Sequence, residues 1–199
     1  IQTYLPNVYK LGWSGQYGWG TAIYLTLYMT VISFIIGGFL GLVTGLLLVL
    51  TRPGGVIENR IVFQILDKIT SLFRAIPFII LLAFINPLTY LLLKNTIGPT
   101  AALVPLSLAV FPFFARQVQV VLSELDGGVI EAAQASGATF WDIVGVYLRE
   151  GLPDLIRVTT VTIISLIGET AMAGAVGAGG LGTLAINYGK NMFNNDVIF

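Results

Sequence analysis

Residues 20–50 read GTAIYLTLYMTVISFIIGGFLGLVTGLLLVL and contain no charged side chain. An α-helix needs about 20 consecutive apolar residues to cross the hydrocarbon core of a bilayer. The stretch ends at the sequence TRPGG, residues 51–55, where a proline and two glycines favour a turn. Residues 20–50 therefore predict a membrane-spanning helix.

The composition of the whole chain supports the same class. Of the 199 residues, 56% are hydrophobic and only 10% are charged, against about 25% charged in a typical soluble domain. So few charges cannot cover a water-exposed surface, which excludes an ordinary soluble enzyme. The formal net charge of 0 argues against nucleic acid as a partner. Because the chain has no His and no Cys, thiolate metal sites, cysteine nucleophiles and Ser/His/Asp triads are excluded.

Gaps between charged residues place the other spans. Residues 75–93 and 95–115 are uncharged, and residues 158–189 are interrupted only by Glu169. Each gap is long enough for one helix through a bilayer. We therefore expect an all-α, polytopic transmembrane fold with four visible spans.

The second span is expected to begin within the apolar periodicity of residues 57–73 and to be kinked at Pro77. Asn86 and Pro87 should close that span. Arg74 lies three residues before Pro77. Its side chain either extends its charged end to the membrane surface or pairs with another group at the kink.

Most charges occupy two windows on one side of the membrane. Residues 52–74 carry 6 of the 20 charges and residues 116–157 carry 9, and two spans separate the windows. Together the windows hold 7 of the 10 Lys and Arg residues. The excess of basic residues in cytoplasmic loops assigns this side to the cytoplasm.

The second window predicts a helix–turn–helix between the third and fourth spans. A short helix rich in small residues should stop at Gly137, because glycine readily adopts a left-handed backbone. Thr139 and Asp142 have the spacing of a capping box and should start another short helix. The element is either a solvated connector or a docking element for another protein. Phe140 and Trp141 would supply the apolar anchors of a docking element.

The same window resembles a signature of bacterial ABC importer permeases. Glu131, Ala132, Ala133 and Gly137 match the E-A-A-x3-G motif of that family at the right spacing. The usual continuation, I-x-L-P after nine residues, is replaced by the sequence YLRE at residues 147–150.

Two further stretches resemble the methionine-importer branch of that family. They are FRAIPFIILL at residues 73–82 and AGAVGAGGLG at residues 173–182. The resemblance implies a single transmembrane permease domain over residues 1–199, with a fifth span after Phe199. It also implies that residues 126–153 form cytoplasmic coupling helices that bind an ATPase subunit. The residues assigned to this contact are Glu131, Ala132, Ala133, Gly137, Thr139, Phe140, Trp141 and Asp142.

The resemblance also implies partners and a location. The partners are a second copy of the chain, two ATP-binding cassette subunits, an extracytoplasmic substrate-binding protein and membrane lipid. The location is a bacterial inner or plasma membrane, which the chain crosses several times. The chain itself has no G-x-x-x-x-G-K-[ST] phosphate loop, since none of its lysines is followed by Ser or Thr. We therefore expect no cofactor and no enzymatic activity on this chain, with ATP and Mg bound by the ATPase partner.

Glu169 is the most unusual residue of the predicted spans. It lies 12 residues after Arg157, which is about 18 Å along a helix and therefore near the middle of the bilayer. Carboxylates at this depth are costly and usually face a cavity or a partner. Glu169 either lines a translocation path or forms a structural hydrogen bond in its protonated form, provided that the span is placed correctly. The residues assigned to a path or gate are Glu169, Met172, Gly174, Gly177, Gly179 and Gly180.

Two sets of glycines have different expected roles. Gly37, Gly41 and Gly45 recur every four residues and allow helices to approach closely, either within the chain or between subunits. The glycines of residues 174–182 weaken a regular helix and predict an unwound or bent segment near the outer face. That segment is either a gate or a site of tight packing.

The sequence therefore predicts the membrane-spanning permease subunit of an ATP-driven amino-acid importer, with methionine as the substrate that the resemblance implies. ATP hydrolysis by a separate subunit would be coupled to alternating access. The alternative is a stand-alone ion-coupled secondary transporter or channel that uses Glu169 as its coupling group. A structural membrane scaffold would explain the small-residue packing but leave Glu169 without a role.

Overall fold

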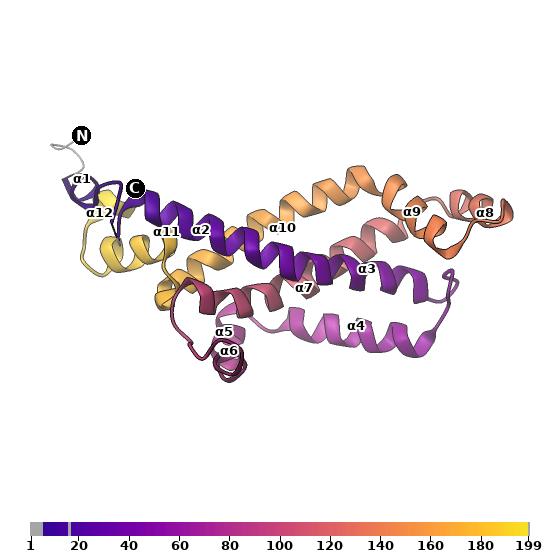
Figure 1. The fold of residues 1–199 in the computed structure, drawn as a ribbon, viewed down its shortest axis with the longest axis horizontal. Helices are drawn as coiled ribbons and strands as arrows, with labels where there is room; N and C mark the ends of the chain where they lie inside the picture. Colours follow the sequence, from indigo (N-terminus) through magenta and orange to yellow (C-terminus); the bar gives the residue numbers. More distant parts are fainter. Residues whose placement is uncertain (1–5, 16, 199) are drawn as a thin grey trace. The chain divides into compact units, whose positions relative to one another are not determined.

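The described part of the chain is mostly helical. The structure, a computed structural model, describes residues 6–15 and 17–198, apart from the side chains of Asn195 and Ile198. Figure 1 shows the helices coloured along the chain. No strand occurs among the described residues, which agrees with the predicted all-α class.

The described residues contain twelve α-helices and three π-helical elements, which are joined by turns and loops. The first half of the chain contains α1 (Pro6–Leu11), α2 (Trp19–Ser33), η1 (Phe34–Gly38), α3 (Phe39–Thr51), α4 (Arg60–Ala75), α5 (Phe78–Phe84) and α6 (Asn86–Leu93). The second half contains α7 (Pro99–Ser123), α8 (Gly127–Ala135), α9 (Phe140–Glu150), α10 (Leu152–Ala173), η2 (Gly174–Ala178), α11 (Gly180–Thr183), η3 (Leu184–Lys190) and α12 (Asn195–Ile198). The π-helical elements have wider turns than an α-helix, a feature that is frequent at functional sites.

Three helices within the described residues are long and apolar enough to cross a membrane. They comprise Trp19–Thr51, Pro99–Ser123 and Leu152–Ala178, and they correspond to the first, third and fourth predicted spans. Many of their large apolar side chains are exposed, including Phe39 at 66% and Ile164 at 64%. Such a surface suits an apolar environment rather than water. The fifth span expected after Phe199 lies outside the described residues.

The prediction that the second span is a helix kinked at Pro77 and closed at Asn86 and Pro87 is wrong. α4 ends at Ala75, and Pro77 has an extended backbone, with φ −56° and ψ 137°, before α5 begins at Phe78. A proline donates no backbone hydrogen bond and disfavours helical backbone in the preceding residue, so the helix breaks instead of kinking. Asn86 and Pro87 open α6 instead of closing a span. A proline is tolerated there because the first turn of a helix has unpaired N–H groups in any case.

The chain divides into two compact units, each with its own apolar core. One comprises Ile1–Gly37, Ile76–Ala109 and Ile163–Phe199, and the other comprises Gly38–Ala75 and Val110–Thr162. The largest fully buried apolar side chains of the first unit are Met29, Leu81, Leu106 and Leu166, and those of the second are Leu48, Leu50, Val118 and Leu122. A single permease domain over residues 1–199 stays a prediction.

Glycines allow close helix packing inside each unit. In the second unit, a Cβ atom at Gly41 would lie 2.8 Å from the carbonyl oxygen of Phe111, and one at Gly45 would lie 2.6 Å from that of Ala115. Gly37 lies equally close to the backbone of α7 within the first unit. The three glycines therefore face α7 of the same chain, which is the first of the two arrangements considered for them.

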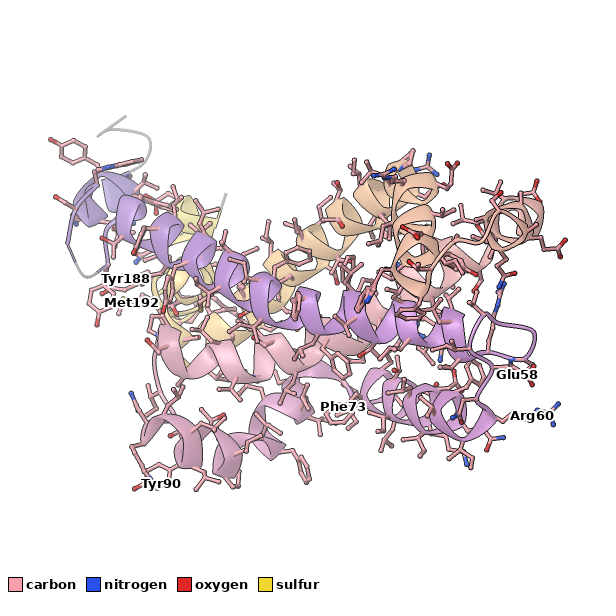
Figure 2. The ribbon with its side chains drawn as sticks, turned by 45° about the vertical axis from the view of Figure 1, so that its right-hand side comes forward. Glu58, Arg60, Phe73, Tyr90, Tyr188 and Met192 are labelled. Carbon is pink, nitrogen blue, oxygen red and sulfur yellow. The ribbon has the colours of Figure 1, made fainter. Side chains whose placement is uncertain are left out.

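Charged side chains mark the start of α4. Figure 2 labels Glu58 and Arg60, whose side chains form an exposed ion pair of 3.6 Å between Oε1 and Nε.

An open cavity of about 450 Å³ lies in the other unit, and Tyr188 and Met192, also labelled in Figure 2, are among the residues that line it. Residues of α1 and α12 line the same cavity, and the Asp196 carboxylate ties these helices by accepting a hydrogen bond from the Asn7 N–H at 2.7 Å.

Candidate docking helices and translocation path

α8 and α9 form the helix–turn–helix that the sequence predicts. The Asp126 carboxylate accepts a hydrogen bond of 2.9 Å from the Gly128 N–H and caps the start of α8. After α8, the backbone turns at Gly137, whose φ is +80°. A residue with a Cβ atom pays roughly 1–2 kcal/mol for this left-handed backbone. Glycine therefore allows the abrupt stop between the two helices.

A complete capping box starts α9. The Thr139 N–H donates to Asp142 Oδ2 at 2.9 Å, and the Asp142 N–H donates to Thr139 Oγ1 at 3.4 Å. The Thr139 hydroxyl also donates to Asp142 Oδ2 at 2.6 Å. These hydrogen bonds, that of the Thr139 side chain first, hold the pKa of the exposed Asp142 carboxyl below its ordinary value of 3.8. The box orients α9 directly after the turn.

The stability that Asp142 gives to the protein is expected to depend on pH. Because folding lowers the pKa of this carboxyl, its contribution is fully present above the ordinary value of 3.8 and is lost as the pH falls below it. To measure this contribution, the midpoint of thermal unfolding is determined from pH 3 to 7 for the wild type and for Asp142→Asn. The wild type should unfold at the higher temperature above about pH 5, and the difference should shrink toward pH 3. A difference that is constant with pH would contradict the assignment.

The predicted docking residues form an exposed surface on α8 and α9. Trp141 is 76% exposed, and its ring packs edge-on against that of Phe140 with 5.2 Å between centroids. Glu131 and Ala132 are exposed and Ala133 is half-buried, so the signature residues lie mainly on the same open surface. Large exposed aromatic side chains are typical of the anchors of protein interfaces.

The opposite faces of these helices are buried against the ends of the long helices. The buried residues are Ile130, Ile143, Val144 and Tyr147. Burial raises the pKa of the Tyr147 hydroxyl above its usual value of 10. A Cβ atom at Gly151 would lie 2.5 Å from Leu122 Cδ2, so the end of α9 is packed directly on the end of α7. The helix–turn–helix is therefore in direct packing contact with α7.

Glu169 lies on α10 in the first unit. Its side chain is half-buried, and its Oε2 atom is buried without a hydrogen-bond partner among the described residues. Beside it, a Cβ atom at Gly168 would meet no atom within 4 Å, and Met172 is 52% exposed. A carboxylate with one unpartnered oxygen thus borders an open face of a predicted span.

The glycine-rich segment after α10 is bent, as predicted. Gly177, Gly179 and Gly180 have φ values of +99°, +87° and +77°. Gly177 interrupts η2, Gly179 lies between η2 and α11, and Gly180 begins α11. Two threonine hydroxyls hold the bend. Thr26 Oγ1 on α2 accepts a hydrogen bond from the Leu181 N–H at 3.0 Å, and Thr183 Oγ1 donates to the Gly174 carbonyl at 2.7 Å.

A protein family model matches most of the chain. Residues 37–198 match "Binding-protein-dependent transport system inner membrane component". The chain belongs to this family. The match includes α8, α9 and the glycine-rich segment, so both candidate sites of the chain lie inside the region that defines this permease family.

Relatives and solved structures place the chain more narrowly within the family. The "Probable D-methionine transport system permease protein MetI" of Pasteurella multocida (strain Pm70) is 49% identical over 83% of this chain and 77% of its own. The "D-methionine transport system permease protein MetI" of Escherichia coli (strain K12) is 45% identical over 76% of this chain and 70% of its own. A structure of the inward-facing MetNI methionine ABC transporter superposes with a TM-score of 0.87, at 44% identity, over 89% of this chain and 83% of that one.

The sequence did not single out Thr26 and Thr183, whose hydroxyls form the hydrogen bonds at the bend. The signal that could have found these two residues is the cost of an unpaired polar group among the apolar residues of a membrane protein. Arg74 is exposed in the last turn of α4, and it takes part in no ion pair within residues 6–15 and 17–198. In that same part of the chain, no cluster of three carboxylates is positioned to hold a metal ion.

Proposed function

We propose that the chain is the permease subunit of an ATP-driven importer of methionine. The relatives at 49% and 45% identity carry names of D-methionine transport permeases, and the superposed structure is that of a methionine ABC transporter. A binding-protein-dependent system is not a stand-alone carrier, so the family match disfavours an ion-coupled transporter based on Glu169. It also disfavours a purely structural scaffold.

The observation that carries this proposal is the two-sided geometry of α8 and α9. Trp141 and the signature residues are exposed on one side, whereas Ile143 and Tyr147 are buried on the other. This arrangement suits a rigid element that receives a displacement from a partner and passes it to the spans. The chain has no phosphate loop of its own, so ATP and Mg bind to separate ATPase subunits in this proposal.

The proposed assembly contains two copies of this chain, two ATP-binding cassette subunits and an extracytoplasmic substrate-binding protein. The chain crosses a bacterial inner or plasma membrane several times, in contact with lipid. Closure of the ATPase subunits displaces α8 and α9 and changes which side of the membrane the path faces. Glu169 and Met172 line that path, and the bend at Gly177–Gly180 acts as its gate. The substrate undergoes no covalent change.

The substrate can be tested with liposomes that contain the full assembly. Uptake of labelled methionine is measured with ATP inside, in the presence of excess unlabelled methionine or excess unlabelled glutamine. Only unlabelled methionine should suppress the uptake strongly. Equal suppression by glutamine would contradict methionine as the substrate while leaving the permease assignment intact.

A further inference from the structure

A polar cluster links α4 to α7 within the second unit. Arg116 Nη2 donates to Asp67 Oδ1 at 2.7 Å and to Ser71 Oγ at 3.0 Å, while Arg116 Nη1 donates to Gln119 Oε1 at 2.7 Å. The ion pair is partly shielded, with the Arg116 and Asp67 side chains 23% and 35% exposed. A pair at this depth is less screened than a surface pair, and its loss leaves an uncompensated charge.

Two buried polar atoms in or beside the cluster form no hydrogen bond with the described residues. The Arg116 Nε atom is buried without a hydrogen-bond partner among the described residues. On the facing helix, the hydroxyl of Thr70, which is 0% exposed, is also buried without one. Buried polar groups without partners are rare and call for an explanation. A second arrangement of the two helices, in which these groups find partners, would explain both.

The position of the cluster connects it to the docking helices. Arg116 lies seven residues before Ser123, the last residue of α7, and therefore about 10 Å from that end of the helix. α8 begins at Gly127, directly after α7. α4 itself packs mainly against α3, and its only fully buried side chain is that of Thr70. The ion pair and the hydrogen bond to Ser71 therefore link α4 directly to α7, the helix that precedes α8.

We propose that Asp67 and Arg116 are positioning residues that make α4 follow α7 when a partner displaces α8 and α9. This proposal rests on the proposed function, because it needs an ATPase partner as the source of the displacement. Asp67 and Arg116 exchange hydrogen-bond partners between the two states of the transport cycle. They touch neither ATP nor the substrate.

The test measures coupling in the full assembly reconstituted in liposomes. Asp67→Asn keeps the size of the side chain and removes its charge, and Arg116→Lys keeps the charge and removes the planar fork. Each variant should lower the amount of methionine taken up per ATP hydrolysed by about five-fold, as expected for residues that transmit coupling. ATP hydrolysis itself should continue in both variants.

The control is the exposed ion pair between Asp154 and Arg157, which joins residues of α10 only, with 3.0 Å between Oδ1 and Nη1. Asp154→Asn should leave the ratio of uptake to hydrolysis unchanged. If the Asp67–Arg116 pair were merely structural, its variants would lower the thermal unfolding midpoint while the folded complex kept its normal ratio, and the proposal would be overturned. A wrong assignment of the function gives a different result, because even the wild-type assembly would then show no ATP-driven methionine uptake.

Discussion

Replacing Gly137 by Trp is expected to weaken the association of the chain with the proposed ATPase subunit at least about ten-fold. Gly137 has a φ of +80°, and it lies exposed between α8 and α9. A tryptophan there adds the cost of a left-handed backbone and places a large ring on the docking surface. The amount of ATPase that copurifies with the tagged permease should fall at least about ten-fold, as at the centre of a protein interface.

Gly137→Asn is the matched control, because asparagine tolerates a left-handed backbone better than other residues with side chains. This variant should retain most of the copurifying ATPase. A tryptophan variant that binds the ATPase as well as the wild type does would show that the turn is not part of the docking surface.

Replacing Gly180 by Val is expected to stop transport without stopping ATP hydrolysis. Gly180 has a φ of +77°, and a Cβ atom would lie 2.7 Å from Thr26 Oγ1. The side chain would therefore strain the backbone and displace the hydrogen bond between the Leu181 N–H and the Thr26 hydroxyl. Strain of this kind costs on the order of 1–3 kcal/mol. Because the bend is the proposed gate, a strained bend should lower methionine uptake in liposomes about ten-fold.

Gly168→Ala on α10 provides the control, since a Cβ atom there would meet no other atom within 4 Å. It should transport at close to the wild-type rate. If Gly180→Val takes up methionine normally, the bend at Gly177–Gly180 is a site of packing and not a gate.

The sequence predicts the helical features that depend on local chemistry. The capping box of Thr139 and Asp142 and the left-handed turn at Gly137 lie where the motif spacing places them. Three of the four long uncharged runs likewise become apolar helices long enough to cross a membrane. These features follow from backbone preferences and from burial in lipid, both of which act over a few turns of chain.

Features that depend on packing between distant segments could not be predicted. Thr26 and Leu181 are 155 residues apart, and Asp67 and Arg116 are 49 apart, so no spacing rule joins them. The break at Pro77 was expected as a kink, because a single proline is compatible with either outcome. At this proline the extended backbone ends α4 and lets the short helices α5 and α6 follow.

The most direct test of the central claim compares the chain alone with the full assembly in liposomes. Our account predicts methionine uptake only when the ATPase subunits, the binding protein and ATP are all present. A proton gradient across liposomes that hold only this chain should drive no uptake. Gradient-driven methionine uptake by the chain alone would contradict the account and restore the ion-coupled carrier.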